Sequence, residues 1–149
     1  MKKSHYEKQV LGYPICIDLQ PLGKDLLVQI TGGCAPHIGS ISVGYWEKGR
    51  SHLKTILLPE HRDDIVGDEF AKTLSEHLHI AVTVICGIHY EAPGKDGLAE
   101  IVACTERLLQ DILTEHGNLN KLGIGLDSNG KFKIGNIEGN VVYQDGEVF

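Results

Sequence analysis

The sequence is poor in the residues that mark disulfide-rich and zinc-binding domains. It contains four cysteines, and no two of them form a CxxC pair. Four widely spaced cysteines are too few for the disulfide scaffold of a small secreted domain, and they lack the spacing of a zinc knuckle. We therefore expect Cys16, Cys34, Cys86 and Cys104 to be reduced thiols.

Long apolar runs and an excess of positive charge are also missing. No stretch reaches the roughly 18 apolar residues of a membrane-spanning helix, and the N-terminus lacks the apolar core of a signal peptide. The chain has 14 basic and 20 acidic residues and a net charge of −6. Scattered basic residues disfavour a nucleic acid or an anionic membrane as the partner. We expect a soluble, cytoplasmic protein that binds neither.

The length of 149 residues favours one compact domain. A chain of this size can bury a stable core without disulfides or a structural metal. We expect a single domain over residues 1–149, with a core at about 13–117 and a C-terminal β extension at about 118–149. The extension is indicated by two hairpin-turn dipeptides, Asn129-Gly130 and Asp145-Gly146.

Alternation of apolar residues predicts five strands in the core. Four of them, at about 15–19, 26–31, 38–46 and 53–58, follow one another closely, which favours an antiparallel meander. The fifth strand, at about 80–90, has the strongest alternation.

Helical spacing appears on either side of the fifth strand. Val66, Phe70, Leu74 and Leu78 recur every four residues after Asp63 or Asp64, either of which suits the N-cap. A second apolar stripe runs from Leu98 and stops at Gly117. The order β-β-β-β-α-β-α plus C-terminal β hairpins predicts an α+β fold, with a mainly antiparallel sheet and two helices on one face. The other face would need a partner or a ligand.

Three histidines lie beside predicted strand ends, namely His37, His61 and His89. Three imidazoles can hold a divalent metal with open positions, or pair as cations with a phosphate. The spacing is neither HxH nor HExxH. Three independent strand-end histidines are therefore the alternative.

The segment 31–39 carries two consecutive glycines, Gly32 and Gly33, before Pro36 and His37. It matches neither a Walker loop nor a dinucleotide fingerprint. Consecutive glycines can form an anion-binding concavity of backbone N–H groups, to which His37 and Arg62 would add positive charge. A bulge or a long hairpin loop is the simpler alternative.

Signals of an enzyme are few. Cys86 and Cys104 lie on apolar faces and are typical of buried cysteines, whereas Cys34 lies in the glycine segment. A nucleophilic Cys34 would require His37 or a loop dipole to lower its pKa. The sequence contains no GxSxG, HExxH or calcium-loop motif.

Four short motifs together resemble the prenylated-flavin chaperone (LpdD-like) family, small accessory proteins of UbiD-type decarboxylases such as gallate decarboxylase. They are Ile30-Thr31-Gly32-Gly33, Ala35-Pro36-His37-Ile38-Gly39, Leu58-Pro59-Glu60-His61-Arg62-Asp63 and Gly87-Ile88-His89. The resemblance covers about residues 22–116. The tail after Gly117 does not match the family.

The resemblance implies a non-catalytic homodimer with a fold similar to proteasome-assembly chaperones. Such a protein binds prenylated FMN, or FMN, protects it, and passes it from a flavin prenyltransferase to a UbiD-type decarboxylase. No catalytic residue is implied, and a divalent metal on His37, His61 and His89 would be compatible with this role. The residues that would meet the cofactor are Gly32, Gly33, Pro36, His37, Ile38, Gly39, His61, Arg62 and His89.

Two other functions stay open. The three histidines could serve a metal-dependent hydrolase or lyase, or the protein could be a dimeric assembly chaperone without a small ligand. Either kind of chaperone would use the uncovered sheet face, near Tyr45 and Trp46, for a symmetric dimer.

Overall fold

The computed structural model describes residues 1–121, 125–126, 132–134 and 142–144. The chain divides into two compact units, Met1–Gln110 and Asp111–Phe149. None of the helices in the described ranges is long and apolar enough to cross a membrane. The expectation of a single domain stays a prediction.

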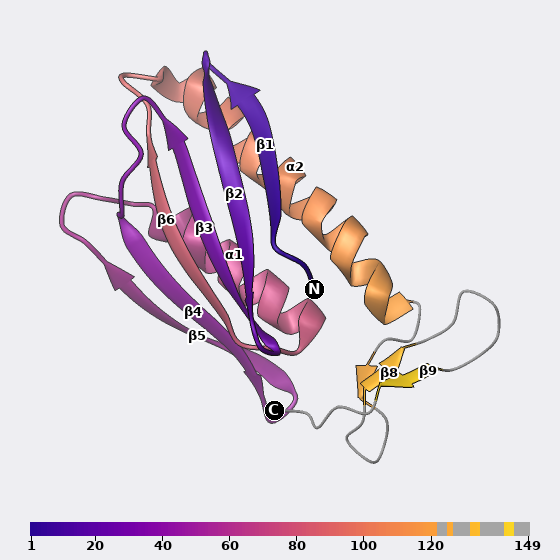
Figure 1. The fold of residues 1–149 in the computed structure, drawn as a ribbon. Coiled ribbons are helices and arrows are strands. Elements are labelled where there is room, and N and C mark those ends of the chain that lie inside the picture. The colour runs from indigo at the N-terminus through magenta and orange to yellow at the C-terminus, as the bar shows by residue number, and fades with distance from the viewer. Residues whose placement is uncertain (122–124, 127–131, 135–141, 145–149) are drawn as a thin grey trace. The chain divides into compact units, whose positions relative to one another are not determined.

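The first unit contains a six-stranded sheet (Figure 1). The order across the sheet is β1-β2-β3-β6-β4-β5, and all neighbours are antiparallel except β3 and β6, which are parallel. In chain order the elements are β1 Ser4–Val10, β2 Tyr13–Leu22, β3 Asp25–Gly33, β4 Ser40–Glu47, β5 Arg50–Leu57, α1 Asp64–Leu78, β6 Val82–His89 and α2 Gly94–Lys121.

One face of the sheet forms the core. The register aligns Ile17, Ile30, Cys86 and Ser40 across four strands, and all four side chains are buried. Both helices lie behind this face in Figure 1, and α1 packs against β4, β5 and β6. The α+β class, with two helices on one face of a mainly antiparallel sheet, is confirmed.

Small residues let α1 lie unusually close to β4. A Cβ added at Gly44 would collide with the backbone carbonyl of Ala71, and one added at Gly67 would press on the hydroxyl groups of Ser40 and Ser42. Ser42 also donates a 2.7 Å hydrogen bond to Asp68 of the helix. This packing fixes where the N-terminus of α1 meets the sheet.

The expected meander of four consecutive strands is wrong, because β6 lies between β3 and β4. The chain leaves β3, pairs β4 with β5, and returns through α1 to fill the gap. The apolar sequence of β6 explains its central place, since a strand covered by a helix and flanked by two strands buries the most apolar surface. Val82, Val84 and Cys86 are fully buried.

Strand β1 was not predicted, because charged residues blur its alternation. Its less exposed side chains are Ser4, Tyr6, Lys8 and Val10, of which Ser4 and Lys8 are polar. The missed signal is the two-residue turn Leu11-Gly12, whose residues have φ angles of 49° and 83°. Positive φ at both central residues is typical of a type I′ hairpin.

Helix α2 is longer than predicted, since it continues past Gly117 to Lys121. One glycine costs a helix about 1 kcal/mol and does not by itself end it. In the second unit, three short antiparallel strands follow: β7 Gly125–Leu126, β8 Phe132–Ile134 and β9 Val142–Gln144. The predicted turn dipeptides Asn129-Gly130 and Asp145-Gly146 lie outside the described residues.

The close approach of α1 predicts that Gly44→Ala destabilises the protein. The new methyl group must push α1 away from β4, which typically costs about 1–3 kcal/mol. Urea unfolding of Gly44→Ala against the wild type measures the loss. Gly23→Ala is the matched control, because its φ is +60° but its Cβ would meet open space, so only backbone strain of about 1 kcal/mol is expected. A loss at Gly44 smaller than that at Gly23 would contradict this account of the packing.

Candidate functional site

Three segments meet at one end of the sheet: the loop 34–39, the start of α1 and the end of β6. The Gly39 N–H donates to the Cys86 carbonyl at 2.9 Å, and the Leu58 N–H donates to the Gly39 carbonyl at 2.9 Å. A Cβ at Gly87 would collide with the carbonyl of His37. The loop therefore lies directly on β6, where only glycine leaves room for it.

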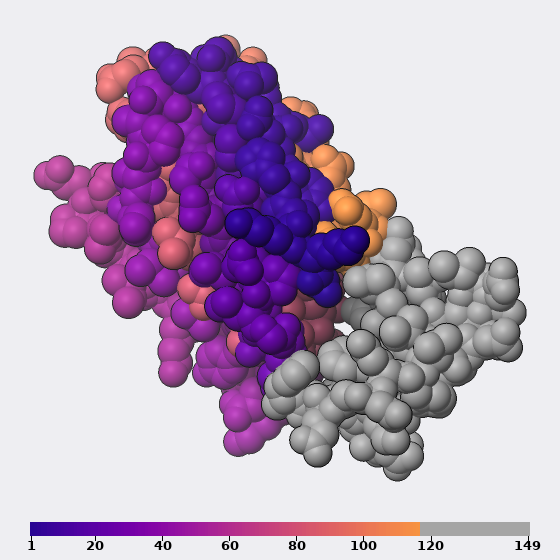
Figure 2. All heavy atoms as spheres, in the orientation of Figure 1, coloured from indigo at the N-terminus to yellow at the C-terminus, as the bar shows by residue number. Residues whose placement is uncertain are grey.

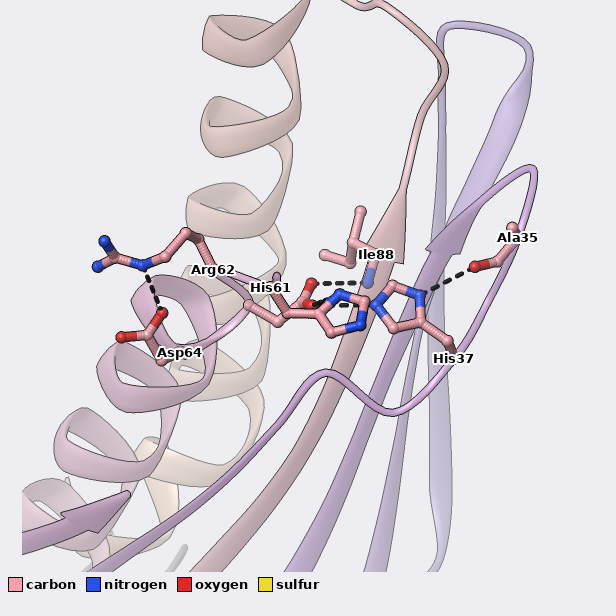
Figure 3. Close-up of polar contacts among 7 residues, drawn as sticks. Ala35, His37, His61, Arg62, Asp64 and Ile88 are labelled. Carbon is pink, nitrogen blue, oxygen red and sulfur yellow. Dashed lines mark hydrogen bonds and ion pairs between the residues drawn. The ribbon is translucent and has the colours of Figure 1, made fainter. Parts of the chain in front are cut away.

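The carboxylate of Asp63 is the centre of this junction, and Figure 3 labels its partners His37, His61 and Ile88. Its side chain is only 8% exposed. Its Oδ1 accepts a 2.9 Å hydrogen bond from the Ile88 backbone N–H, while its Oδ2 lies 3.0 Å from His37 Nε2 and 3.7 Å from His61 Nδ1. One buried carboxylate thus joins α1, β6 and both histidines.

Asp63 occupies the N-cap of α1, one of the two positions that the sequence predicts for it. Its side chain nevertheless makes no capping hydrogen bond. An N-cap side chain typically stabilises a helix by about 1 kcal/mol. Here the carboxylate is instead directed at His37, His61 and the Ile88 amide, which indicates that its role lies in the junction.

The two histidine rings are held from both sides. Nδ1 of His37 lies 3.0 Å from the Ala35 carbonyl, which can only accept a hydrogen bond, so this nitrogen carries a proton. The ring of His61 stacks on the ring of His37 at a centroid distance of 4.5 Å. The side chains are 23% and 36% exposed. One side of the ring pair therefore faces the buried Asp63 carboxylate, and the other side is open to solvent.

His89 does not join this pair. Its Nε2 lies 2.9 Å from Glu91 Oε1, and its backbone carbonyl lies 3.6 Å from the thiol of Cys34. Among the described residues, His37 and His61 group with Asp63, whereas His89 groups with Cys34 and Glu91. The sequence missed Asp63 as a site residue because its position already suited a helix cap.

Arg62 and the glycine pair have different surroundings from those expected for an anion cradle. The Arg62 side chain is 72% exposed, points away from the histidines in Figure 3, and pairs with Asp64 at 3.2 Å. Gly32 and Gly33 are buried at the end of β3, where a Cβ at Gly33 would collide with the His89 carbonyl. The glycine pair thus serves close packing between strands. Pro36 and Ile38 are exposed on the loop itself.

The cysteines show little sign of nucleophilic chemistry. Burial raises the pKa of Cys86 and Cys104, and burial together with Glu7 raises the pKa of Cys16 to about 11. Cys34 is exposed, but both nitrogens of His37 face other partners, Ala35 and Asp63. The histidine needed to activate Cys34 is therefore engaged elsewhere.

The junction predicts that Asp63→Ala is far more destabilising than Asp64→Ala. Removing Asp63 leaves the Ile88 amide without its acceptor, which typically costs about 1–3 kcal/mol, whereas Asp64 pairs with an exposed arginine and should cost less than about 1 kcal/mol. Urea unfolding of the two neighbouring variants makes the comparison. Equal losses would show that the carboxylate of Asp63 does not hold the junction together.

Comparisons with known proteins match the part of the chain that contains this site. Residues 9–117 match the model of the prenylated flavin chaperone LpdD-like domain. Protein LpdD of Lactiplantibacillus plantarum is 29% identical over 108 residues, which cover 69% of this chain and 77% of that protein. A chain from the structure of a chaperone complex for yeast 20S proteasome assembly aligns with a TM-score of 0.43 and 15% identity, covering 84% of this chain and 100% of its own length. Because the matched domain spans most of the sequence, the chain belongs to the prenylated flavin chaperone LpdD-like family, whose members are chaperones and not catalysts.

Proposed function

We propose that the protein binds prenylated FMN at the stacked pair His37 and His61 and hands it to a UbiD-type decarboxylase. The observation that carries the proposal is the half-exposed histidine pair on a buried carboxylate, within the segment that the family domain covers. Membership in a chaperone family removes the alternative of a metal-dependent hydrolase or lyase.

The surroundings of the pair fit a flavin. Ile38 belongs to the loop 34–39, Ile65 to the start of α1, and Leu58 follows β5 and is hydrogen-bonded to Gly39 of the loop. Their exposed fractions are 53%, 59% and 37%. Exposed apolar side chains beside aromatic rings suit the face of an isoalloxazine ring and its prenyl-derived extension. Nε2 of His61 would supply a polar atom for the edge of the flavin, since both ring nitrogens of His37 face Ala35 and Asp63. An apolar surface with few polar groups is what a cofactor-holding site needs.

The phosphate has a less complete set of partners. Of the expected residues, Arg62 is the exposed cation next to the pair, but it now pairs with Asp64. An exposed salt bridge is weak, so a phosphate can compete for the guanidinium group at little cost. We therefore assign Pro36, His37, Ile38, His61 and Arg62 to the cofactor surface, with the buried Gly32, Gly33 and Gly39 as packing residues and His89 at its margin.

The exposure of the site suits the storage and transfer of the cofactor. Reduced flavin reacts with oxygen, so a protein that covers one face of it has a use without any chemistry of its own. A site at the surface, and not in a closed cavity, lets a flavin prenyltransferase load the cofactor and a decarboxylase remove it. The chaperone then needs moderate affinity and fast release.

Anaerobic titration with prenylated FMN tests this function. We expect His61→Ala to weaken binding about tenfold, because the loss of one stacking ring and one polar contact is worth about 1.4 kcal/mol. His52→Ala is the matched control. His52 is also half-buried and stacks on an aromatic ring, that of Tyr45. It lies on β5, opposite Tyr45 near the C-terminal end of β4, whereas the histidine pair lies beyond the N-terminal end of β4.

Two further readouts separate binding from chaperone function. Wild-type protein should slow the air oxidation of the reduced cofactor, and the loaded protein should activate a UbiD-type apo-decarboxylase. No binding by the wild type, or equal losses in His61→Ala and His52→Ala, would remove the cofactor from this site.

We also propose that the protein is a homodimer that uses the uncovered face of the sheet. Ile85, Ile41 and Ile56 lie side by side in register across β6, β4 and β5 on that face, and Ile56 is 61% exposed. Within Met1–Gln110 both helices lie on the opposite face, and strand side chains fill the surface seen in Figure 2. A row of apolar side chains at a surface favours a symmetric contact.

Light scattering at micromolar concentration should therefore give the mass of two chains. Ile56→Asp should shift the protein toward the mass of one chain, because a charge would be buried in the contact. Leu22→Asp is the control, since Leu22 is 57% exposed at the β2–β3 turn. A one-chain mass for the wild type, or no difference between the variants, would refute this dimer.

A further inference from the structure

We propose that His37 Nε2, His61 Nδ1 and Asp63 Oδ2 form a binding site for a first-row divalent transition metal ion. The three atoms lie within 4.8 Å of one another. The sequence suggested a metal on three histidines, but the structure replaces His89 with a carboxylate. The resulting donor set, two imidazoles and one carboxylate, is common to zinc and non-haem iron sites with open positions.

The distances suit shared ligands. Bonds from such metals to imidazole nitrogen and carboxylate oxygen are about 2.0–2.2 Å. Two ligands on the same ion are therefore separated by about 3–3.5 Å in tetrahedral or octahedral geometry. Oδ2 of Asp63 lies 3.0 Å from His37 Nε2 and 3.7 Å from His61 Nδ1. Small side-chain rotations would suffice to bring all three atoms, which lie within 4.8 Å of one another, onto one ion.

Two of the three ligands, His37 and Asp63, are hydrogen-bonded to neighbouring backbone groups, as metal ligands usually are. Nδ1 of His37 donates to the Ala35 carbonyl, so a metal would displace the Nε2 proton that faces Asp63 and bind through the Nε2 lone pair. The second oxygen of Asp63 accepts the Ile88 N–H. A Cβ at Gly39 would collide with Asp63 Oδ2. The backbone therefore holds the donor atoms in place from outside the cluster.

A plain ion pair accounts for only part of this arrangement. The hydrogen bond from His37 to Asp63 needs no third group, and His61 at 3.7 Å is beyond hydrogen-bond length. Yet the chain stacks the His61 ring on that of His37 and gives up the helix cap at Asp63. A metal ion explains why all three side chains converge.

Two other groups of metal-binding residues are weaker candidates. Cys34, His89 and Glu91 are all exposed. His5, Glu7 and Cys16 have no buried member, and the raised pKa of the Cys16 thiol disfavours the thiolate that a metal requires. Among the groups found in the described residues, only the one containing Asp63 has a buried ligand.

Three protein ligands leave positions on the ion open. The open positions would take oxygen ligands such as water or a phosphate, since an oxyanion suits a borderline divalent ion. The metal site does not depend on the proposed function. It is tested with metal alone, whereas flavin binding can be tested on chelator-treated protein, so that one can fail without the other.

Isothermal titration of chelator-treated full-length protein with Zn²⁺ tests the site, and the visible absorbance of Co²⁺ reports its nitrogen and oxygen ligands. We expect one ion per chain, bound at least tenfold more weakly by His61→Ala and by Asp63→Asn. His89→Ala and His5→Ala are matched controls, because each removes a histidine from one of the two other groups. Both controls should bind like the wild type.

Circular dichroism of each variant shows whether it is folded. If Asp63→Asn unfolds, the half-exposed His61 still decides the question through His61→Ala. Unchanged affinity in folded His61→Ala would overturn the proposal. Absence of binding by the wild type, or loss of the ion only in His89→Ala or His5→Ala, would overturn it as well.

Discussion

The carboxylate of Asp63 is the interaction on which the functional end of the fold depends. It is nearly buried, and a buried carboxylate is costly unless every oxygen has a partner. The Ile88 amide satisfies one oxygen, and His37 satisfies the other, with His61 nearby. Because these partners come from β6, the loop 34–39 and the segment before α1, one desolvated charge ties three distant parts of the sequence together.

That charge can reach the sheet only because small residues bring the neighbouring backbones together. Gly44 and Gly67 let α1 lie close to β4, and Gly39 and Gly87 let the loop lie on β6. A methyl group at Gly39 or Gly87 would strike Asp63 or His37 directly. The glycines that the sequence offered as an anion cradle thus belong to a wider pattern of close packing, in which their lack of a side chain positions other residues.

The sequence predicts much of the architecture but little of the site geometry. Alternation located β2 to β6, and helical spacing placed the start of α1, because these patterns reflect burial on one face. The central position of β6 was missed, since pairing between strands is decided by contacts distant in sequence. For the same reason His37 and His61 could be singled out but not separated from His89, and Asp63, adjacent to the helix, was interpreted only as a cap. Strand β1 was missed because its charged residues weaken the apolar alternation. The Leu11-Gly12 turn was the signal that could have identified it.

The histidine pair is fixed on its buried side and exposed on the other side. This contrast is consistent with a protein that holds a ligand without transforming it. Hydrogen bonds to Ala35 and Asp63 orient the His37 ring, and the His61 ring stacks on it, so ligand binding would cost little side-chain entropy. The opposite sides of the rings and the neighbouring Ile38 and Ile65 stay exposed, so a bound molecule keeps one face accessible to the next protein. Under the proposed function, pre-organisation would favour retention of the cofactor, and incomplete burial would limit the affinity so that the cofactor can leave. A site that excludes water encloses its ligand, whereas the His37 and His61 side chains are 23% and 36% exposed.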